Sequence, residues 1–70
     1  MRLMKVEIKP GLAVKMFRVP STAASVGSYR VVLYRKNGSN QWDESLVFNS
    51  LKRLKHAEMF YNWALTRVDA

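Results

Sequence analysis

The chain contains no cysteine, and this absence excludes several kinds of site at once. Disulfide bonds, thiolate nucleophiles and cysteine-ligated zinc are all ruled out. A chain without cysteine also fits a reducing compartment. The start, Met1–Lys5, lacks the apolar core of a signal peptide, and the longest strongly apolar run, Val31–Leu33, is far too short to span a membrane. We therefore expect a cytoplasmic protein without a membrane partner.

Acidic residues are also scarce, with 5 Asp and Glu against 12 Lys and Arg, which gives a net charge of +7. Residues 1–42 hold eight cations and one acid, Glu7 (8 − 1 = +7), whereas residues 43–70 hold four of each (4 − 4 = 0). The excess therefore belongs to the N-terminal part. Such an asymmetric positive field attracts polyanions or acidic protein surfaces.

Reactive groups are few as well. The one histidine, His56, has no cysteine to pair with, and the serines lie in expected turns and caps. The adjacent acids Asp43 and Glu44 would point to opposite sides of a strand. No glycine-rich phosphate loop and no histidine–carboxylate metal spacing occurs. We therefore expect neither an enzyme nor a cofactor or metal site.

The first two apolar stretches have the alternation of strands, at residues 3–9 and 12–19, separated by the turn dipeptide Pro10-Gly11. A two-residue loop would place Lys15 opposite Val6. A three-residue loop instead pairs Val6 with Val14 and Met4 with Met16. Because burial should decide between registers that differ by one residue, we favour the three-residue loop.

A small-residue connecting loop at 20–28 is followed by two further strands, 29–36 and 41–48, joined at Asn37-Gly38, the strongest hairpin signal in the chain. Either a two- or a four-residue loop puts Trp42, Leu46 and Phe48 beside the apolar side of the third strand. Glu44 falls on the same side and breaks the pattern. The fourth strand should therefore be an edge strand or carry a bulge.

The period becomes helical from Ser50, with Asn49 or Ser50 as the cap, and nothing interrupts it before Val68. The broad apolar stripe, with Phe60 at its margin, consists of Leu51, Leu54, Ala57, Tyr61, Ala64, Leu65 and Val68. We predict one α+β domain, residues 1–70, in the order β-β-β-β-α. It has a four-stranded antiparallel sheet (residues 3–48) and one C-terminal helix (50–68) packed on one face. A chain this short has little stability to spare, so a homodimer is left open.

One helix leaves the other face of the sheet open. From the expected registers, that face displays Lys5, Lys9, Lys15, Phe17, Arg30, Val32, Tyr34 and Lys36. Cations can neutralise phosphates and aromatic rings can stack on bases, so the pattern favours a nucleic-acid platform. The alternative is that these cations only solvate an open sheet and that the rings make cross-strand contacts.

Cations crowd the expected helix start, at Lys52, Arg53 and Lys55, where the helix dipole favours acids. This pattern predicts a site for a phosphate or carboxylate, with a tolerated local cost as the alternative. A second helical stripe away from the core contains Lys52, His56, Met59, Trp63 and Arg67. Met59 and Trp63 are spaced to touch and could anchor a protein interface. We favour the other interpretation, in which the 20–28 loop covers Trp63.

The segment Tyr29–Leu65 contains a strand, the Asn37-Gly38 turn, a strand ending in Phe48-Asn49-Ser50, and a helix with Ala57 and Trp63. In this outline it resembles the arm-site DNA-binding domains of phage integrases. The resemblance covers about half of the chain and rests on no diagnostic motif. Small phage-encoded inhibitors of bacterial defence share the outline. The resemblance implies an origin in a phage or mobile element and assigns no role to any residue.

Two functions follow from these patterns. The first is a basic module that binds DNA or RNA through the open sheet face and the helix start. The second is a protein-binding inhibitor, such as an anti-CRISPR protein, that docks on an acidic or nucleic-acid-like surface of a host complex. The first predicts generic nucleic-acid binding that weakens steeply with salt, whereas the second predicts one tight protein partner.

Overall fold

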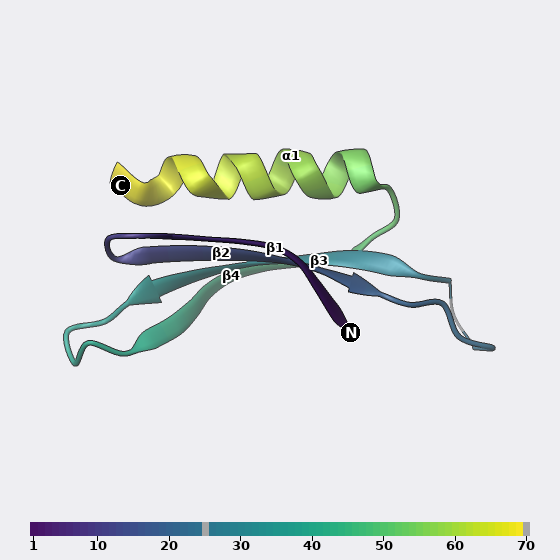
Figure 1. The fold of residues 1–70 in the computed structure, drawn as a ribbon, viewed down its shortest axis with the longest axis horizontal. Helices are drawn as coiled ribbons and strands as arrows, with labels where there is room; N and C mark the ends of the chain where they lie inside the picture. The colour runs from purple at the N-terminus through teal and green to yellow at the C-terminus, as the bar shows by residue number, and fades with distance from the viewer. Residues whose placement is uncertain (25, 70) are drawn as a thin grey trace.

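Four antiparallel strands in the order β1-β2-β3-β4 form one sheet, and a single helix covers one of its faces (Figure 1). The computed structural model describes residues 1–24 and 26–69, with only the backbone described for residues 68 and 69. The elements are β1 (Arg2–Lys9), β2 (Leu12–Val19), β3 (Ser28–Lys36), β4 (Trp42–Leu51), α1 (Leu54–Leu65) and a 3-10 turn, η1 (Thr66–Asp69). The predicted α+β architecture is confirmed.

The core lies between α1 and the two central strands. Its fully buried side chains on the sheet are Leu12, Val14, Met16, Val31 and Leu33. The helix contributes Ala57, Tyr61 and Ala64, and the two alanines let its backbone approach the sheet closely. Each large side chain removed from water here stabilises the fold by about 1.5–3 kcal/mol. Leu54, expected in the same stripe, is 41% exposed, and the side chain of Val68 lies outside the described part.

The register of the first hairpin differs from the favoured prediction. Lys9 pairs with Leu12 across a two-residue turn, and Val6 lies opposite Lys15. The turn chemistry decided the register, because Pro10 fits the second position of a type II turn and Gly11, at φ 77°, fits the third. As a result, Lys5, Glu7 and Lys9 face the helix side, while Val6 and Ile8 lie on the open side.

Strand β4 carries two bulges and is an edge strand, as the position of Glu44 had indicated. Ser45 is the extra residue between the pairs Leu33–Leu46 and Tyr34–Glu44. This bulge turns Trp42 and Glu44 to the open face, whereas Leu46 and Phe48 stay on the helix side. The expectation that Trp42 shares a face with Leu46 and Phe48 was therefore wrong.

The Asn37-Gly38 hairpin is confirmed, with five residues rather than two or four between the paired ends Lys36 and Trp42. The side-chain oxygen of Asn37 accepts hydrogen bonds from the backbone N–H of Ser39 (2.8 Å) and Gln41 (3.0 Å). Its amide nitrogen donates to Asp43 at 2.9 Å. This one side chain therefore organises the turn.

The helix begins later than predicted, because β4 continues to Leu51 and Ser50 adopts a left-handed backbone at φ 59°. Arg53 is the N-cap residue and makes no side-chain capping bond. The expected caps Asn49 and Ser50 lie in the strand instead. Among the described residues, no helix is long and apolar enough to cross a membrane.

Candidate functional site

The face of the sheet opposite α1, called the open face below, carries six of its eight predicted side chains. Cross-strand pairs place Lys15 with Val32, Phe17 with Arg30, and Tyr34 and Lys36 with residues of β4. The two-residue turn removes Lys5 and Lys9 to the helix side, so this part of the prediction was wrong. The paired residues on the open face are Leu3, Val6, Ile8, Ala13, Lys15, Phe17, Val19, Ser28, Arg30, Val32, Tyr34, Lys36, Trp42, Glu44 and Val47.

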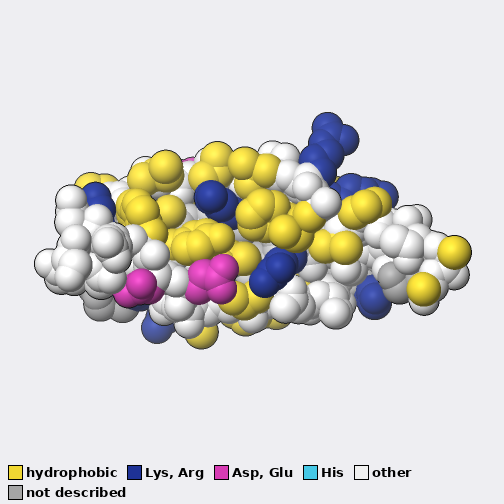
Figure 2. All heavy atoms as spheres, turned by 90° about the horizontal axis from the view of Figure 1, so that it is seen from below, with side chains coloured by type: hydrophobic (Ala, Val, Ile, Leu, Met, Phe, Trp, Pro, Cys, Tyr) yellow, Lys and Arg dark blue, Asp and Glu magenta, His cyan; other side chains and the backbone are white. Residues whose placement is uncertain are grey.

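The open face is mainly apolar. Figure 2 shows hydrophobic side chains spread over most of it, with isolated basic and acidic groups among them. Five of the open-face residues are large apolar side chains in contact with water: Leu3 (47% exposed), Val6 (46%), Ile8 (69%), Trp42 (41%) and Val47 (37%). At the centre, Val32 is 1% exposed although no helix covers this face. Exposed apolar side chains gathered on one face are typical of interaction sites.

A hollow of about 180 Å³ lies at one end of the open face, lined by Ile8, Ala13, Lys15, Tyr34 and Trp42. Two cations lie over rings at this end: Lys15 Nζ is 5.4 Å from the centroid of Tyr34, and Lys36 Nζ is 5.3 Å from that of Trp42. The hollow can therefore take an apolar group while the ammonium groups beside it meet a negative charge.

Arg30 is the third cation of the open face. It is half-buried, and its Nε is removed from water without a hydrogen-bond acceptor among the described residues. A buried donor without an acceptor is unfavourable, so a partner that supplies a carboxylate or phosphate here would satisfy it if the side chain turns outward. Glu44 is the one acid on this face within the paired residues of β1 to β4.

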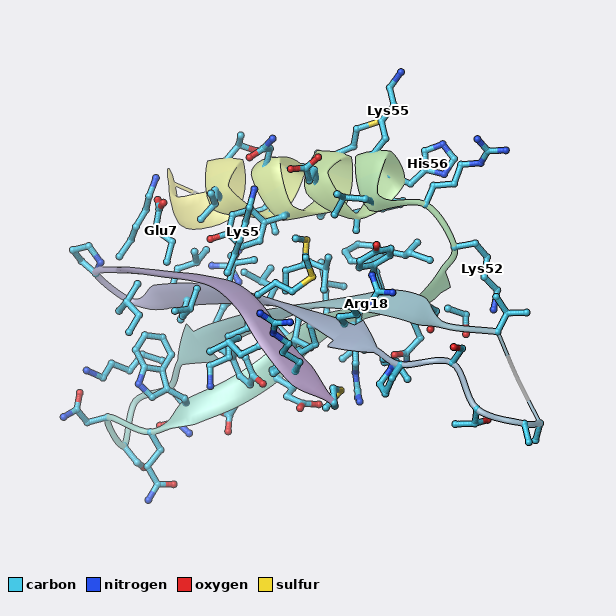
Figure 3. The ribbon with its side chains drawn as sticks, turned by 45° about the vertical axis from the view of Figure 1, so that its right-hand side comes forward. Lys5, Glu7, Arg18, Lys52, Lys55 and His56 are labelled. Carbon is cyan, nitrogen blue, oxygen red and sulfur yellow. The ribbon has the colours of Figure 1, made fainter. Side chains whose placement is uncertain are left out.

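Three cations on the helix side, Lys5, Lys9 and Arg18, have partners inside the molecule. Lys5 Nζ lies 3.2 Å from Glu58 of α1 and 5.5 Å from the ring of Tyr61. In Figure 3, Lys5 and Glu7 point from β1 toward the helix. Burial, and to a smaller extent Glu7, raises the pKa of Tyr61. Lys9 lies 3.8 Å from Glu7, and Arg18 donates to the Tyr29 hydroxyl at 3.1 Å. Lys5 therefore ties β1 to the helix, whereas Lys9 and Arg18 have their partners within the sheet.

The helix start keeps its cations but lacks a built anion site. Lys52, Arg53 and Lys55 are exposed, and the first turn of α1 contains no acid. Lys52 lies beside the 20–28 loop, next to Arg18 and Tyr29, and Lys55 points away from the sheet (Figure 3). Lys52 and Lys55 therefore point in different directions, so the predicted convergence of cations on one ligand lacks geometric support.

Trp63 lies beside β4, and the described residues of the 20–28 loop do not cover it. The described residues of that loop border Arg18, Tyr29 and Lys52 at the other end of the sheet (Figure 1). Trp63 is 42% exposed and meets the ring of Phe48 edge-on, with centroids 5.9 Å apart. Met59 is 60% exposed, and Arg67 lies over Trp63 at 4.9 Å. The favoured interpretation, burial by the loop, was wrong.

Sequence reasoning missed the apolar members of the open face, above all Leu3, Val6, Ile8, Trp42 and Val47. Two signals could have found most of them: Pro10-Gly11 as a two-residue turn places Val6 and Ile8, and Glu44 as the mark of a bulge in β4 places Trp42. Among the described residues, no three His, Cys, Asp or Glu side chains lie together as a metal site would need. In comparisons with known proteins, no family model, no curated protein and no solved structure matches this chain.

Proposed function

We propose that this chain is a non-enzymatic protein-binding module whose open face docks on a partner protein. The partner surface is apolar where it meets the aliphatic patch and acidic where it meets Lys15, Arg30 and Lys36. The observation that carries the proposal is the exposure of Leu3, Val6, Ile8, Trp42 and Val47 on one side of a sheet that has no cover there.

Aliphatic side chains favour a protein partner over a nucleic acid. Leu3, Val6 and Ile8 can neither stack on bases nor neutralise phosphates, but they gain from leaving water. Trp42, Tyr34 and Arg30 are of the types that dominate binding energy at protein interfaces. The free edges do not invite strand addition, because β1 has a bulge at Met4 and β4 has two bulges. These features support docking through the face of the sheet.

The positive charge of the chain indicates that the partner surface is acidic. The chain carries a net +7, and within the paired strands the open face has three cations and one acid. A second copy of this chain would bring the same positive field to the interface, whereas an acidic surface would complement it. Combined with the outline shared with phage-encoded inhibitors, this supports an acidic or nucleic-acid-like surface of a host protein as the target. The absence of cysteine fits an intracellular setting.

Single-stranded nucleic acid is the second candidate, and one observation favours it. Two cation–ring pairs, Lys15 with Tyr34 and Lys36 with Trp42, lie on the open face together with Phe17 and Arg30. Rings beside cations are the elements of a stacking platform. The exposed Lys52, Arg53 and Lys55 would add to the attraction of the phosphate backbone. This candidate leaves the exposed aliphatic half of the face without a role.

The test compares capture from a bacterial lysate by the wild-type protein and by Ile8→Asp. Ile8 is 69% exposed, so the change should leave the fold intact, and circular dichroism checks this. The matched control is Asn62→Asp, which adds the same charge at an exposed position on the helix. The proposal expects one protein to bind wild type and the control, with or without nuclease, and to be lost with Ile8→Asp. Capture that disappears with nuclease, or that Ile8→Asp retains, would contradict it.

A further inference from the structure

A second apolar surface lies on the helix side of the sheet, between α1 and the edge strand β4. This helix groove is lined by Phe48, Met59, Phe60 and Trp63 and encloses about 280 Å³. Phe48 lies on the helix side, while its neighbour Val47 lies on the open face. The helix groove and the open face therefore occupy opposite faces of the molecule.

The aromatic side chains of the helix groove hold one another in place. Phe48 and Phe60 stack with centroids 4.5 Å apart and an interplanar angle of 23°. Trp63 meets Phe48 edge-on at 84°, and the guanidinium of Arg67 covers Trp63 at 4.9 Å. Side chains fixed by such contacts lose little freedom on binding, which is a property of interface anchors. The groove is therefore a preformed surface.

Along the helix, cations precede and follow the two exposed wall residues of the helix groove, Met59 and Trp63. Lys55 is one helical turn before Met59, and Arg67 is one turn after Trp63, so each adjoins an apolar wall residue. The nearest acid on the helix, Glu58, is turned to the β1 side, where it pairs with Lys5 at 3.2 Å. No ion pair within the described residues involves Lys55 or Arg67. An apolar groove with uncompensated positive charge beside its exposed wall residues is complementary to an acidic segment.

We propose that the helix groove is a second docking site, which takes an acidic segment of a partner protein through one inserted aliphatic or aromatic side chain. The inserted side chain packs against Phe48 and Trp63, and carboxylates on either side of it meet Lys55 and Arg67. The site is independent of the proposed function of the open face. A chain that uses both sites holds two protein surfaces on opposite sides of the sheet.

The test uses Trp63 as its own reporter. The chain has two tryptophans, so the variant Trp42→Phe leaves Trp63 as the single tryptophan and keeps an aromatic ring on the open face. The probe is a short synthetic peptide with Asp and Glu residues around a central Leu-Phe pair. Two matched peptides replace either the Leu-Phe pair by Ser-Ser or the acids by Asn and Gln. Titrations follow Trp63 emission in the Trp42→Phe protein and in its Met59→Glu and Asn62→Glu derivatives.

The proposal expects the acidic Leu-Phe peptide to change Trp63 emission with saturation. The Ser-Ser peptide should bind at least about tenfold more weakly, as the loss of one buried apolar side chain implies. The peptide with Asn and Gln should also bind more weakly, because it cannot pair with Lys55 and Arg67. Met59→Glu should weaken binding by a similar factor, because it places a carboxylate in the wall of the groove. Asn62→Glu should change it less than about twofold, because it adds the same charge at an exposed position outside the groove. Absence of saturable binding, equal binding of the Ser-Ser peptide, or binding that survives Met59→Glu would overturn the inference. Loss of the open-face partner with Ile8→Asp would leave this result unaffected.

Discussion

The same substitution at two valines, Val6→Thr and Val14→Thr, tests which side of β1 faces the helix. Val14 is fully buried in the core, whereas Val6 is 46% exposed on the open face. Threonine keeps the branched shape and the preference for strands, so the change exchanges a methyl group for a hydroxyl. In the observed register the two side chains lie on opposite faces, whereas the three-residue turn would have paired them with each other.

The expected losses in the free energy of unfolding differ several-fold between the two variants. At Val14 the hydroxyl would be buried without an assured partner, which lowers the free energy of unfolding by about 1–3 kcal/mol. For a domain of this size, that corresponds to a fall in Tm of about 4–8 °C for each kcal/mol. At Val6 the hydroxyl reaches water, and the loss should stay below about 0.5 kcal/mol. The double variant should be additive to within about 0.5 kcal/mol, because the two side chains lie on opposite faces of the sheet and share no partner.

Thermal and urea unfolding followed by circular dichroism measure these differences. Two results would refute the register: a loss at Val6 as large as that at Val14, or a strongly non-additive double variant. Either would mean that the apolar side of β1 faces the core. The exposed patch would then be smaller, and the argument for a protein partner would lose its main support.

Two further predictions concern α1. Arg53→Ser should raise the free energy of unfolding by about 1 kcal/mol, because Arg53 has the extended backbone of an N-cap but no capping side chain. The control Lys52→Ser should leave the free energy of unfolding unchanged. Equal melting temperatures of the two variants would argue against this cap. Burial, with Glu7 second, raises the pKa of Tyr61 above 10.0, so the folded state holds the phenol proton more tightly than the unfolded chain does. The resulting stability is fully present below pH 10 and should be lost as the pH rises through the higher folded pKa. Urea unfolding at a series of alkaline pH values should show a smaller decline for Tyr61→Phe than for wild type. Identical declines would contradict this prediction.

The element order could be predicted from the sequence because each signal was local. Alternation marked the strands, Asn37-Gly38 marked the second hairpin, and the helical stripe contained Ala57, Tyr61 and Ala64. The facing of the edge strands could not be predicted in the same way. Burial favoured Val6 in the core, but the type II turn at Pro10-Gly11 fixed the opposite register. Lys5 tolerates the helix side because its long side chain reaches Glu58 and the ring of Tyr61.

The candidate site was predicted in part for the same reason. Lys15, Arg30 and Tyr34 lie on central strands, where both neighbours fix the facing, and they were placed correctly on the open face. The facing of Trp42 depended on a bulge in β4. Glu44 indicated such a bulge but not that Ser45 is the extra residue, so Trp42 was assigned to the wrong face. The exposure of Trp63 depended on where the 20–28 loop lies, and small polar residues do not encode a loop direction.

The most direct test of the central claim, that the open face binds a protein through apolar contacts, is a salt titration of affinity. It compares the captured protein partner with a generic single-stranded oligonucleotide, for wild type, Ile8→Asp and the triple variant Lys15→Ala, Arg30→Ala and Lys36→Ala. We predict tight binding of the protein with a shallow salt dependence, lost with Ile8→Asp, and weak binding of the oligonucleotide. The contradicting result is tight binding of the oligonucleotide that Ile8→Asp leaves intact. In that case the logarithm of the binding constant should fall with the logarithm of the salt concentration, with a slope of about −0.7 per phosphate contact, and the slope should be shallower for the triple variant.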